Sequence, residues 1–300
     1  MQPELPLRFA FEPGLAQSYD ESGWCFVEAA ISAGVKIGKR RLNLSKRTDH
    51  LLAYSGYLDA FRNLEDVCAA ARLPPLLPDE VRRLLGTEKK FTSSTDLDRV
   101  DQLYRTFFDG VTLAATELNM QGLGWTVTEV QQLITVLPCF TALTSLDLSN
   151  NKLGEEGGVA VAGGVLRAMT SVTECNFRGN RLNEESVKEI AKIGTEKRIM
   201  LFGIKHGQAE ADLSSQGLGS VDAILIANDL AVTTSMTKIS LAGNCLGEEG
   251  TKSICEAVKA STMLKDLDLG GRSDFGTTTS NIDGAAGARH VADMLLVTTS

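Results

Sequence analysis

The stretch that decides the fold runs from residue 143 to residue 166 and reads LTSLDLSNNKLGEEGGVAVAGGVL. In its first half, Leu143, Leu146 and Leu148 are separated by polar residues, which predicts a short strand with one buried face. A Gly-Glu-Glu-Gly turn follows, and residues 159–166 are then apolar over a length that suits a short helix. The stretch therefore predicts one strand followed by one helix.

The same pattern returns along the chain. Its third leucine position recurs at spacings of 30, 29, 36, 28 and 28 residues and is filled by Leu118, Leu148, Phe177, Leu213, Leu241 and Leu269. An amide position three residues further along holds Gln121, Asn151, Asn180, Gln216 and Asn244. An amide both donates and accepts, so it can satisfy backbone groups where the chain turns inside a buried core. Glutamine in two copies predicts looser turns there.

The spacing L-x-x-L-x-L-x-x-N-x-L at residues 143–153, continued by G-E-E-G, resembles a leucine-rich repeat of the ribonuclease-inhibitor subclass. The resemblance implies an α/β solenoid, in which a curved parallel sheet lines a concave side and helices lie outside. About six repeats would fill residues 111–300. Extra chain at residues 195–208 accounts for the long third spacing, and the sixth copy carries a Gly/Thr/Ser-rich insertion at residues 272–281.

Residues 1–110 lack this pattern and are expected to form a mostly helical region that caps the first repeat. Apolar spacing and capping residues predict helices at residues 21–33, 57–71, 78–85 and 96–111. The open end of a repeat array exposes apolar surface, so a cap is needed. The alternative is an independent domain on a linker. At the other end the chain stops where a next strand would begin, so we expect a partner or further repeats to cover it.

Residues 22–28, Ser-Gly-Trp-Cys-Phe-Val-Glu, resemble the S-x-W-C-x-x-E box of TIR domains, as in uncharacterised algal proteins whose leucine-rich repeats follow such a segment. We interpret residues 18–48 as a TIR-like remnant. In enzymatic TIR domains the box glutamate is catalytic in NAD cleavage, and the resemblance implies that role for Glu28. The competing interpretation is a buried aromatic at Trp24 and a solvated carboxylate at Glu28.

Composition narrows the class of protein. The net charge of −8 argues against a nucleic-acid or anionic-membrane partner. The six cysteines show no C-x-x-C spacing and are expected to be reduced thiols of a cytoplasmic protein. The sequence contains no phosphate-binding loop, no nucleophile elbow and no metal-ligand spacing among its three histidines. We therefore expect neither catalysis, nor a cofactor, nor a metal.

The expected binding surface is the concave face, where residues between the leucines point outward. In this register the central column is Glu117, Asp147, Asn176, Asp212, Ser240 and Asp268, and the neighbouring column includes Arg178 as an isolated positive charge. The candidate partner-binding residues are Glu117, Asp147, Asn176, Arg178, Asp212 and Asp268. An acidic column favours a basic or polar protein partner. Alternatively, short polar residues only keep a crowded sheet soluble.

Two functional hypotheses follow for the repeats. The first is a non-enzymatic scaffold that binds proteins through the concave face or through the insertion at residues 272–281. The second is a GTPase regulator like the Ran GTPase-activating protein, which uses the same repeat class; it rests on fold analogy alone. A TIR-type NAD hydrolase acting through Glu28 is the third alternative.

Overall fold

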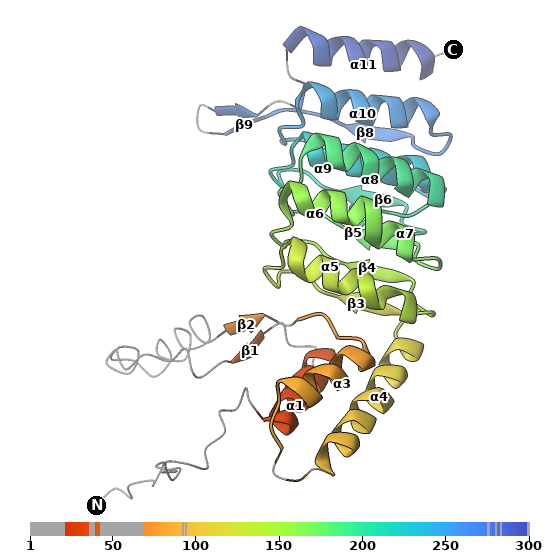
Figure 1. Ribbon diagram of the computed structural model, residues 1–300. Coiled ribbons are helices and arrows are strands. Elements are labelled where there is room, and N and C mark those ends of the chain that lie inside the picture. Colours follow the sequence, from red (N-terminus) through yellow and green to blue (C-terminus); the bar gives the residue numbers. More distant parts are fainter. Residues whose placement is uncertain are drawn as a thin grey trace, which may run out of the picture. The chain divides into compact units, whose positions relative to one another are not determined.

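The structure, a computed structural model, describes residues 22–35, 40–42, 69–71, 73–91, 93, 95–274, 277–279, 281–282 and 284–298. The chain divides into two compact units (Figure 1). The first unit combines residues 1–36 with 75–111, and the second combines residues 37–74 with 112–300. The expectation that residues 1–110 cap the repeats concerns how the two units meet, and it stays a prediction.

The first unit is helical where it is described. Its helices are α1 (Gly23–Val35), α3 (Pro78–Thr87) and α4 (Asp96–Ala114), whose last turn enters the second unit. Their bounds nearly coincide with those of three helices predicted from the sequence, at residues 21–33, 78–85 and 96–111. The buried side of α4 carries Val100, Tyr104 and Phe108, four residues apart, whereas Leu103 on the same helix is 48% exposed. The Tyr104 hydroxyl donates to the carbonyl of Leu76 at 2.8 Å, and burial raises its pKa to about 12.

The second unit alternates short strands with helices. Its strands are β3 (Glu117–Asn119), β4 (Ser145–Asp147), β5 (Glu174–Asn176), β6 (Glu210–Asp212), β7 (Lys238–Ser240) and β8 (Asp266–Asp268). The helices between them are α5 (Val127–Val136), η3 (Leu137–Cys139), α6 (Gly154–Ala160), the π-helical η4 (Val161–Val165), α7 (Leu166–Ala168), α8 (Glu184–Lys197), α9 (Ser220–Val232) and α10 (Gly247–Ala260). Helix α11 (Gly284–Thr298) follows the last strand.

Two antiparallel strand pairs lie outside this alternation. Strand β1 (Arg40–Leu42) pairs with β2 (Ala69–Ala71), and β9 (Arg272–Asp274) pairs with β10 (Thr277–Thr279). The first pair corrects the helix predicted at residues 57–71: its end is a strand, and residues 57–68 lie outside the described part of the chain. The second pair shows that the insertion in the sixth copy contains a hairpin.

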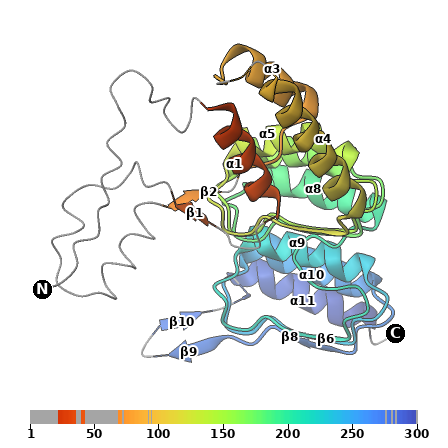
Figure 2. The ribbon, with the colours of Figure 1, turned by 90° about the horizontal axis from the view of Figure 1, so that it is seen from below.

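The six repeat strands form two parallel sheets of three, in the orders β3-β4-β5 and β6-β7-β8. Helices form one layer and strands the other (Figure 2). Inward-facing residues of the strands, such as Leu146, Cys175 and Ile239, are buried between the layers. The side of the sheets that faces away from the helices is called the strand face below.

The observed register corrects the first copy. Leu118 pairs with Leu146, two residues earlier in the repeat than the sequence pattern placed it. Met120 therefore fills the third leucine position, and Leu123, instead of Gln121, fills the amide position. The error arose because Leu118 and Leu123 have the same spacing as Leu148 and Leu153 of the second copy, so they were matched to those positions although they lie two residues earlier in the repeat.

Buried asparagines secure the turns that follow the strands. The side chain of Asn151 donates to the carbonyls of Met120 and Leu148 at 2.9 and 2.8 Å and accepts from the backbone N–H of Trp125 at 3.0 Å. Asn244 bonds to backbone groups in the same way, whereas Asn180 donates to the carbonyls of Leu148 and Phe177 and its amide oxygen has no partner among the described residues. These contacts confirm the role expected of the amide.

Two further copies differ at the amide position: Gln216 makes fewer contacts, as the sequence predicted for glutamine, and the sixth copy has an asparagine that the sequence pattern did not identify. Gln216 is exposed and its side-chain nitrogen donates only to the carbonyl of Asp212, at 3.2 Å, among the hydrogen bonds of the described residues. In the sixth copy the position is filled by Asn281, which is fully buried and donates to the carbonyls of Leu241 and Leu269. The repeat thus resumes after its inserted hairpin.

The extra chain between α8 and β6 explains why the sheet is interrupted. Residues 199–204, called the inserted segment below, run beside β5, where the N–H groups of Cys175 and Phe177 donate to the carbonyls of Met200 and Leu201. In a continuous sheet the segment would donate in turn to β6. Instead the N–H groups of Leu201 and Phe202 donate to the carboxylate of Asp229 on α9.

Asp229 and its neighbour Asn228 together hold the inserted segment. Asn228 donates to the carbonyl of Ile199 at 2.9 Å and to Asp229 at 3.1 Å. Asp229 is fully buried, and burial raises its pKa to about 7 although backbone and amide N–H donors act in the opposite direction. The α9 side chains therefore replace the strand partner that the segment lacks.

Candidate functional site

The polar column on the strand face has a structural role in the turns. Asp147 accepts a hydrogen bond from the N–H of Ser149, two residues later, at 2.8 Å. Four more residues make the same contact with the N–H two positions on: Asn119, Asn176, Asp212 and Asp268. Asx side chains favour such local turns. The turn needs a short side chain with an acceptor oxygen at this position, and aspartate and asparagine both supply it.

The corrected register changes the membership of the column. Glu117 pairs with Ser145 and lies in the next column of the sheet, while Asn119 stands beside Asp147. The placement of Glu117 in the central column was therefore wrong, for the same two-residue slip. Glu117 is still exposed on the strand.

Charges around the column are less uniformly negative than expected. The Nζ atom of Lys238 lies 2.9 Å from Oδ2 of Asp266 on the adjacent strand, and Nζ of Lys205 lies 2.6 Å from Oε2 of Glu174. Lys238 stands on β7 itself, so Arg178 is not the single cation of the strand face. Within the column, hydrogen bonds from the side chain and backbone of Ser214 lower the pKa of Asp212 below its usual range.

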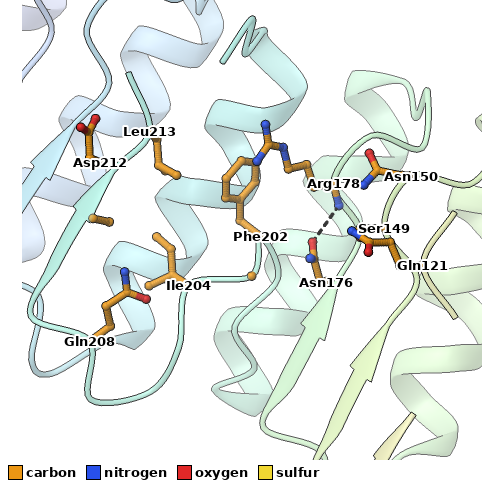
Figure 3. Close-up of a pocket in the computed structure, with 12 residues that line it drawn as sticks. Gln121, Ser149, Asn150, Asn176, Arg178, Phe202, Ile204, Gln208, Asp212 and Leu213 are labelled. Carbon is orange, nitrogen blue, oxygen red and sulfur yellow. Dashed lines mark hydrogen bonds between the residues drawn. The ribbon is translucent and has the colours of Figure 1, made fainter. Parts of the chain in front are cut away.

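A pocket of about 220 Å³ opens on the strand face at the interruption between the two sheets (Figure 3). Its lining brings together three of the predicted site residues, Asn176, Arg178 and Asp212. Asp147 and Asp268 stand elsewhere in the column and do not line it. Arg178 and Asp212 lie on opposite sides of the pocket, one following β5 and the other on β6.

The inserted segment supplies the part of the pocket that sequence reasoning missed. Phe202, Gly203 and Ile204 line it, and the guanidinium of Arg178 lies over the Phe202 ring, 5.3 Å from the ring centre. Gly203 has a φ of +103°, and a Cβ there would lie 2.8 Å from the side-chain nitrogen of Asn176. The excess of chain length in the third spacing was the one sequence signal for this feature.

The pocket's chemistry is that of a binding site. It combines a stacked guanidinium, a carboxylate, four side-chain amides and an apolar wall. Arginine on an aromatic face is attracted by the ring and keeps its planar donors free for an anion. No group of three or more His, Cys, Asp or Glu side chains that could hold a metal ion occurs among the described residues.

The segment that resembles a TIR box lies on α1. The indole N–H of Trp24 donates to the carboxylate of Asp96 at 3.2 Å, and the side chain is half-buried. Glu28 is exposed. Residues 18–21, 36–39 and 43–48 of the interpreted remnant lie outside the described part of the chain, so the TIR interpretation stays a prediction.

Comparison with known proteins gives a family match and several relatives, among them two ribonuclease inhibitors. A family described as Leucine Rich repeat matches residues 141–162. The ribonuclease inhibitor of Mus musculus is 24% identical over 182 residues, which cover 51% of this chain and 38% of the inhibitor. That of Sus scrofa is 26% identical over 184 residues, which cover 60% of this chain and 36% of the inhibitor. The chain spans little more than a third of these relatives, and it carries a leucine-rich repeat.

None of the helices in the described ranges combines the length and the apolar character that crossing a bilayer requires.

Proposed function

We propose that this chain is a non-enzymatic protein-interaction scaffold, built as a leucine-rich-repeat solenoid of the ribonuclease-inhibitor type, which binds its partner on the strand face. The relatives' similarity and the repeated strand-helix units support the scaffold. The observation that carries the choice of face is the pocket at the sheet interruption, because it gathers a stacked arginine, a carboxylate and apolar side chains at one open position. Interfaces are commonly anchored by such arginine and aromatic pairs.

The acidic column favours a partner whose binding segment is mainly basic. Asp147 is half-exposed, and Asp212 and Asp268 are exposed on the same face. Their summed field would attract a basic segment and speed its association, and added salt would weaken this effect. The partner's own positive charges would lie along the column, to either side of the pocket.

The test removes these charges without breaking the turns. The triple variant Asp147→Asn, Asp212→Asn and Asp268→Asn keeps an acceptor for each turn N–H, as Asn119 and Asn176 do in the native chain. A matched control, Glu196→Gln, Glu256→Gln and Asp293→Asn, removes the same charge from exposed helix positions. The 300-residue chain and both variants serve as bait for lysate of the source cells, and captured proteins are quantified by mass spectrometry.

We expect partners that bind the native chain and the control but are depleted several-fold on the triple variant, more so at low salt. Partners retained equally on all three baits would exclude the strand face. Acceleration of GTP hydrolysis by a captured GTPase, or NAD cleavage abolished by Glu28→Gln, would replace the scaffold by the regulator or the hydrolase.

A further inference from the structure

The pocket contains a guanidinium that is positioned but not neutralised. Arg178 is half-buried, and within the described residues no carboxylate lies within ion-pair distance of it. Its side chain rests on the buried ring of Phe202. Stacking of this kind restricts the side chain, so less conformational freedom is lost when its planar donors bind an anion.

A second observation in the same pocket points to a ligand. Ser149 lines the pocket and is 1% exposed, yet its hydroxyl oxygen makes no hydrogen bond with any described residue. Ser149 and Arg178 lie near each other on the same side of the pocket (Figure 3). Buried hydroxyl groups are almost always hydrogen-bonded. A ligand that accepts from both side chains would satisfy the hydroxyl and neutralise the guanidinium together.

We propose that the pocket binds a carboxylate of the protein partner, held by the guanidinium of Arg178 with the hydroxyl of Ser149 as a second donor. This proposal rests on the proposed scaffold function and specifies its anchor. Two parallel N–H donors match the two oxygens of a carboxylate. The Ser149 oxygen is closed to solvent, so the carboxylate reaches it after a small side-chain shift.

Asp212 determines how that carboxylate must be delivered. Its charge stands across the pocket from Arg178, and the column beyond it is acidic. The negative field of the face therefore weakens the binding of a small free anion without excluding it from the guanidinium. A partner segment that is basic overall and carries one acidic residue meets both requirements, because its positive side chains offset the repulsion while the carboxylate enters beside Arg178.

Arginine side-chain nuclear magnetic resonance tests the proposal without knowledge of the partner. The full chain is labelled with ¹⁵N-arginine, and Arg178→Lys identifies the Nε–H signal of Arg178. The probes are N-acetylglutamate α-amide, its glutamine analogue, N-acetylalanine with a free α-carboxylate, and inorganic phosphate. The exposed Arg181, which does not line the pocket, is the internal control.

We expect a saturable shift of the Arg178 signal with a carboxylate probe and none with the glutamine analogue. The stronger of the two carboxylate probes identifies a side-chain or a chain-terminal carboxylate. Ser149→Ala and Phe202→Leu should each weaken binding several-fold, with Ser149→Ala leaving the fold intact. Absence of a saturable shift, equal shifts at Arg181, or binding of phosphate alone would overturn the proposal.

The same proteins separate this proposal from the scaffold function. One outcome supports the scaffold function and refutes the carboxylate anchor. In that outcome partners are depleted on the triple Asp→Asn bait but retained on an Arg178→Gln bait, and the titration shows no saturable shift. A saturable titration with partners indifferent to the Asp→Asn changes supports the carboxylate site and refutes binding along the column.

Discussion

Replacing Asp229 with asparagine tests the interaction that ends the first sheet. The two carboxyl oxygens accept from the N–H groups of Leu201 and Phe202, and a protonated oxygen keeps a lone pair for this purpose. The amide nitrogen of an asparagine has no lone pair to offer, so it would place a donor against a backbone N–H. A buried donor left without a partner costs about 1–3 kcal/mol. We therefore expect Asp229→Asn to lower the free energy of unfolding by about that amount at pH 5.

The size of this loss should depend on pH in a definite direction. Burial raises the pKa of Asp229 from 3.8 to about 7, so between those values the folded state holds a proton that the unfolded state has lost. The contribution of Asp229 to stability is therefore present at low pH and is lost as the pH rises through about 7. A pKa difference of this size corresponds to about 2–3 kcal/mol between pH 5 and pH 8.

Urea unfolding followed by circular dichroism at pH 5, 6.5 and 8 measures both effects. The native protein should exceed Asp229→Asn in stability at pH 5, and the gap should narrow by about 2–3 kcal/mol by pH 8. Asp293→Asn, at an exposed position of α11, is the control and should show no such trend. A gap that widens with pH would refute the reasoning, because it would mean that the N–H donors outweigh burial and keep the carboxylate ionised.

Three further substitutions, two of them with a matched control, test the repeats and the inserted segment by urea unfolding. Leu148→Ala should cost about 2–5 kcal/mol, since it empties a fully buried position between repeats, and a cost near zero would contradict the register. Asn151→Ala should cost about 1–3 kcal/mol by leaving backbone groups without partners, whereas the exposed Gln216→Ala should stay within about 0.5 kcal/mol; equal costs would refute the role of the buried amide. Gly203→Ala should lower the free energy of unfolding by about 1–3 kcal/mol, which is more than Gly207→Ala should. Both glycines have a positive φ, but only at Gly203 would the added carbon meet a neighbouring side chain. A larger loss at Gly207 would disprove the close approach at Gly203.

Most of the repeat architecture could be predicted because leucine spacing reports burial directly. Leu146, Leu148 and Leu153 are buried as the pattern required, and the strands pair in parallel. The first copy failed because Met120 and Trp125 replace leucines there, so the pattern matched its remaining leucines in the wrong register. Apolar periodicity fixes which face is buried but tolerates a slip of two residues on a strand.

The candidate site was only half predictable for a different reason. Asp212 could be identified because it continues the acidic central column, and Arg178 because it is an isolated positive charge in the neighbouring column. Phe202 and Gly203 belong to a segment that follows no repeat, and its position depends on hydrogen bonds to Asp229, far away in the sequence. Buried polar contacts between distant residues leave no periodic trace, so only the structure could bring these residues to the pocket.

The hairpin in the sixth copy has a consequence for engineering. The chain leaves the repeat after Leu269 and returns at Asn281, whose amide still reaches the backbone of the preceding copy. The turn therefore depends on where the asparagine arrives and not on how many residues lead to it. Foreign loops of various lengths, such as an epitope or a fluorescent reporter, should be accepted at this position of any copy that keeps its buried asparagine.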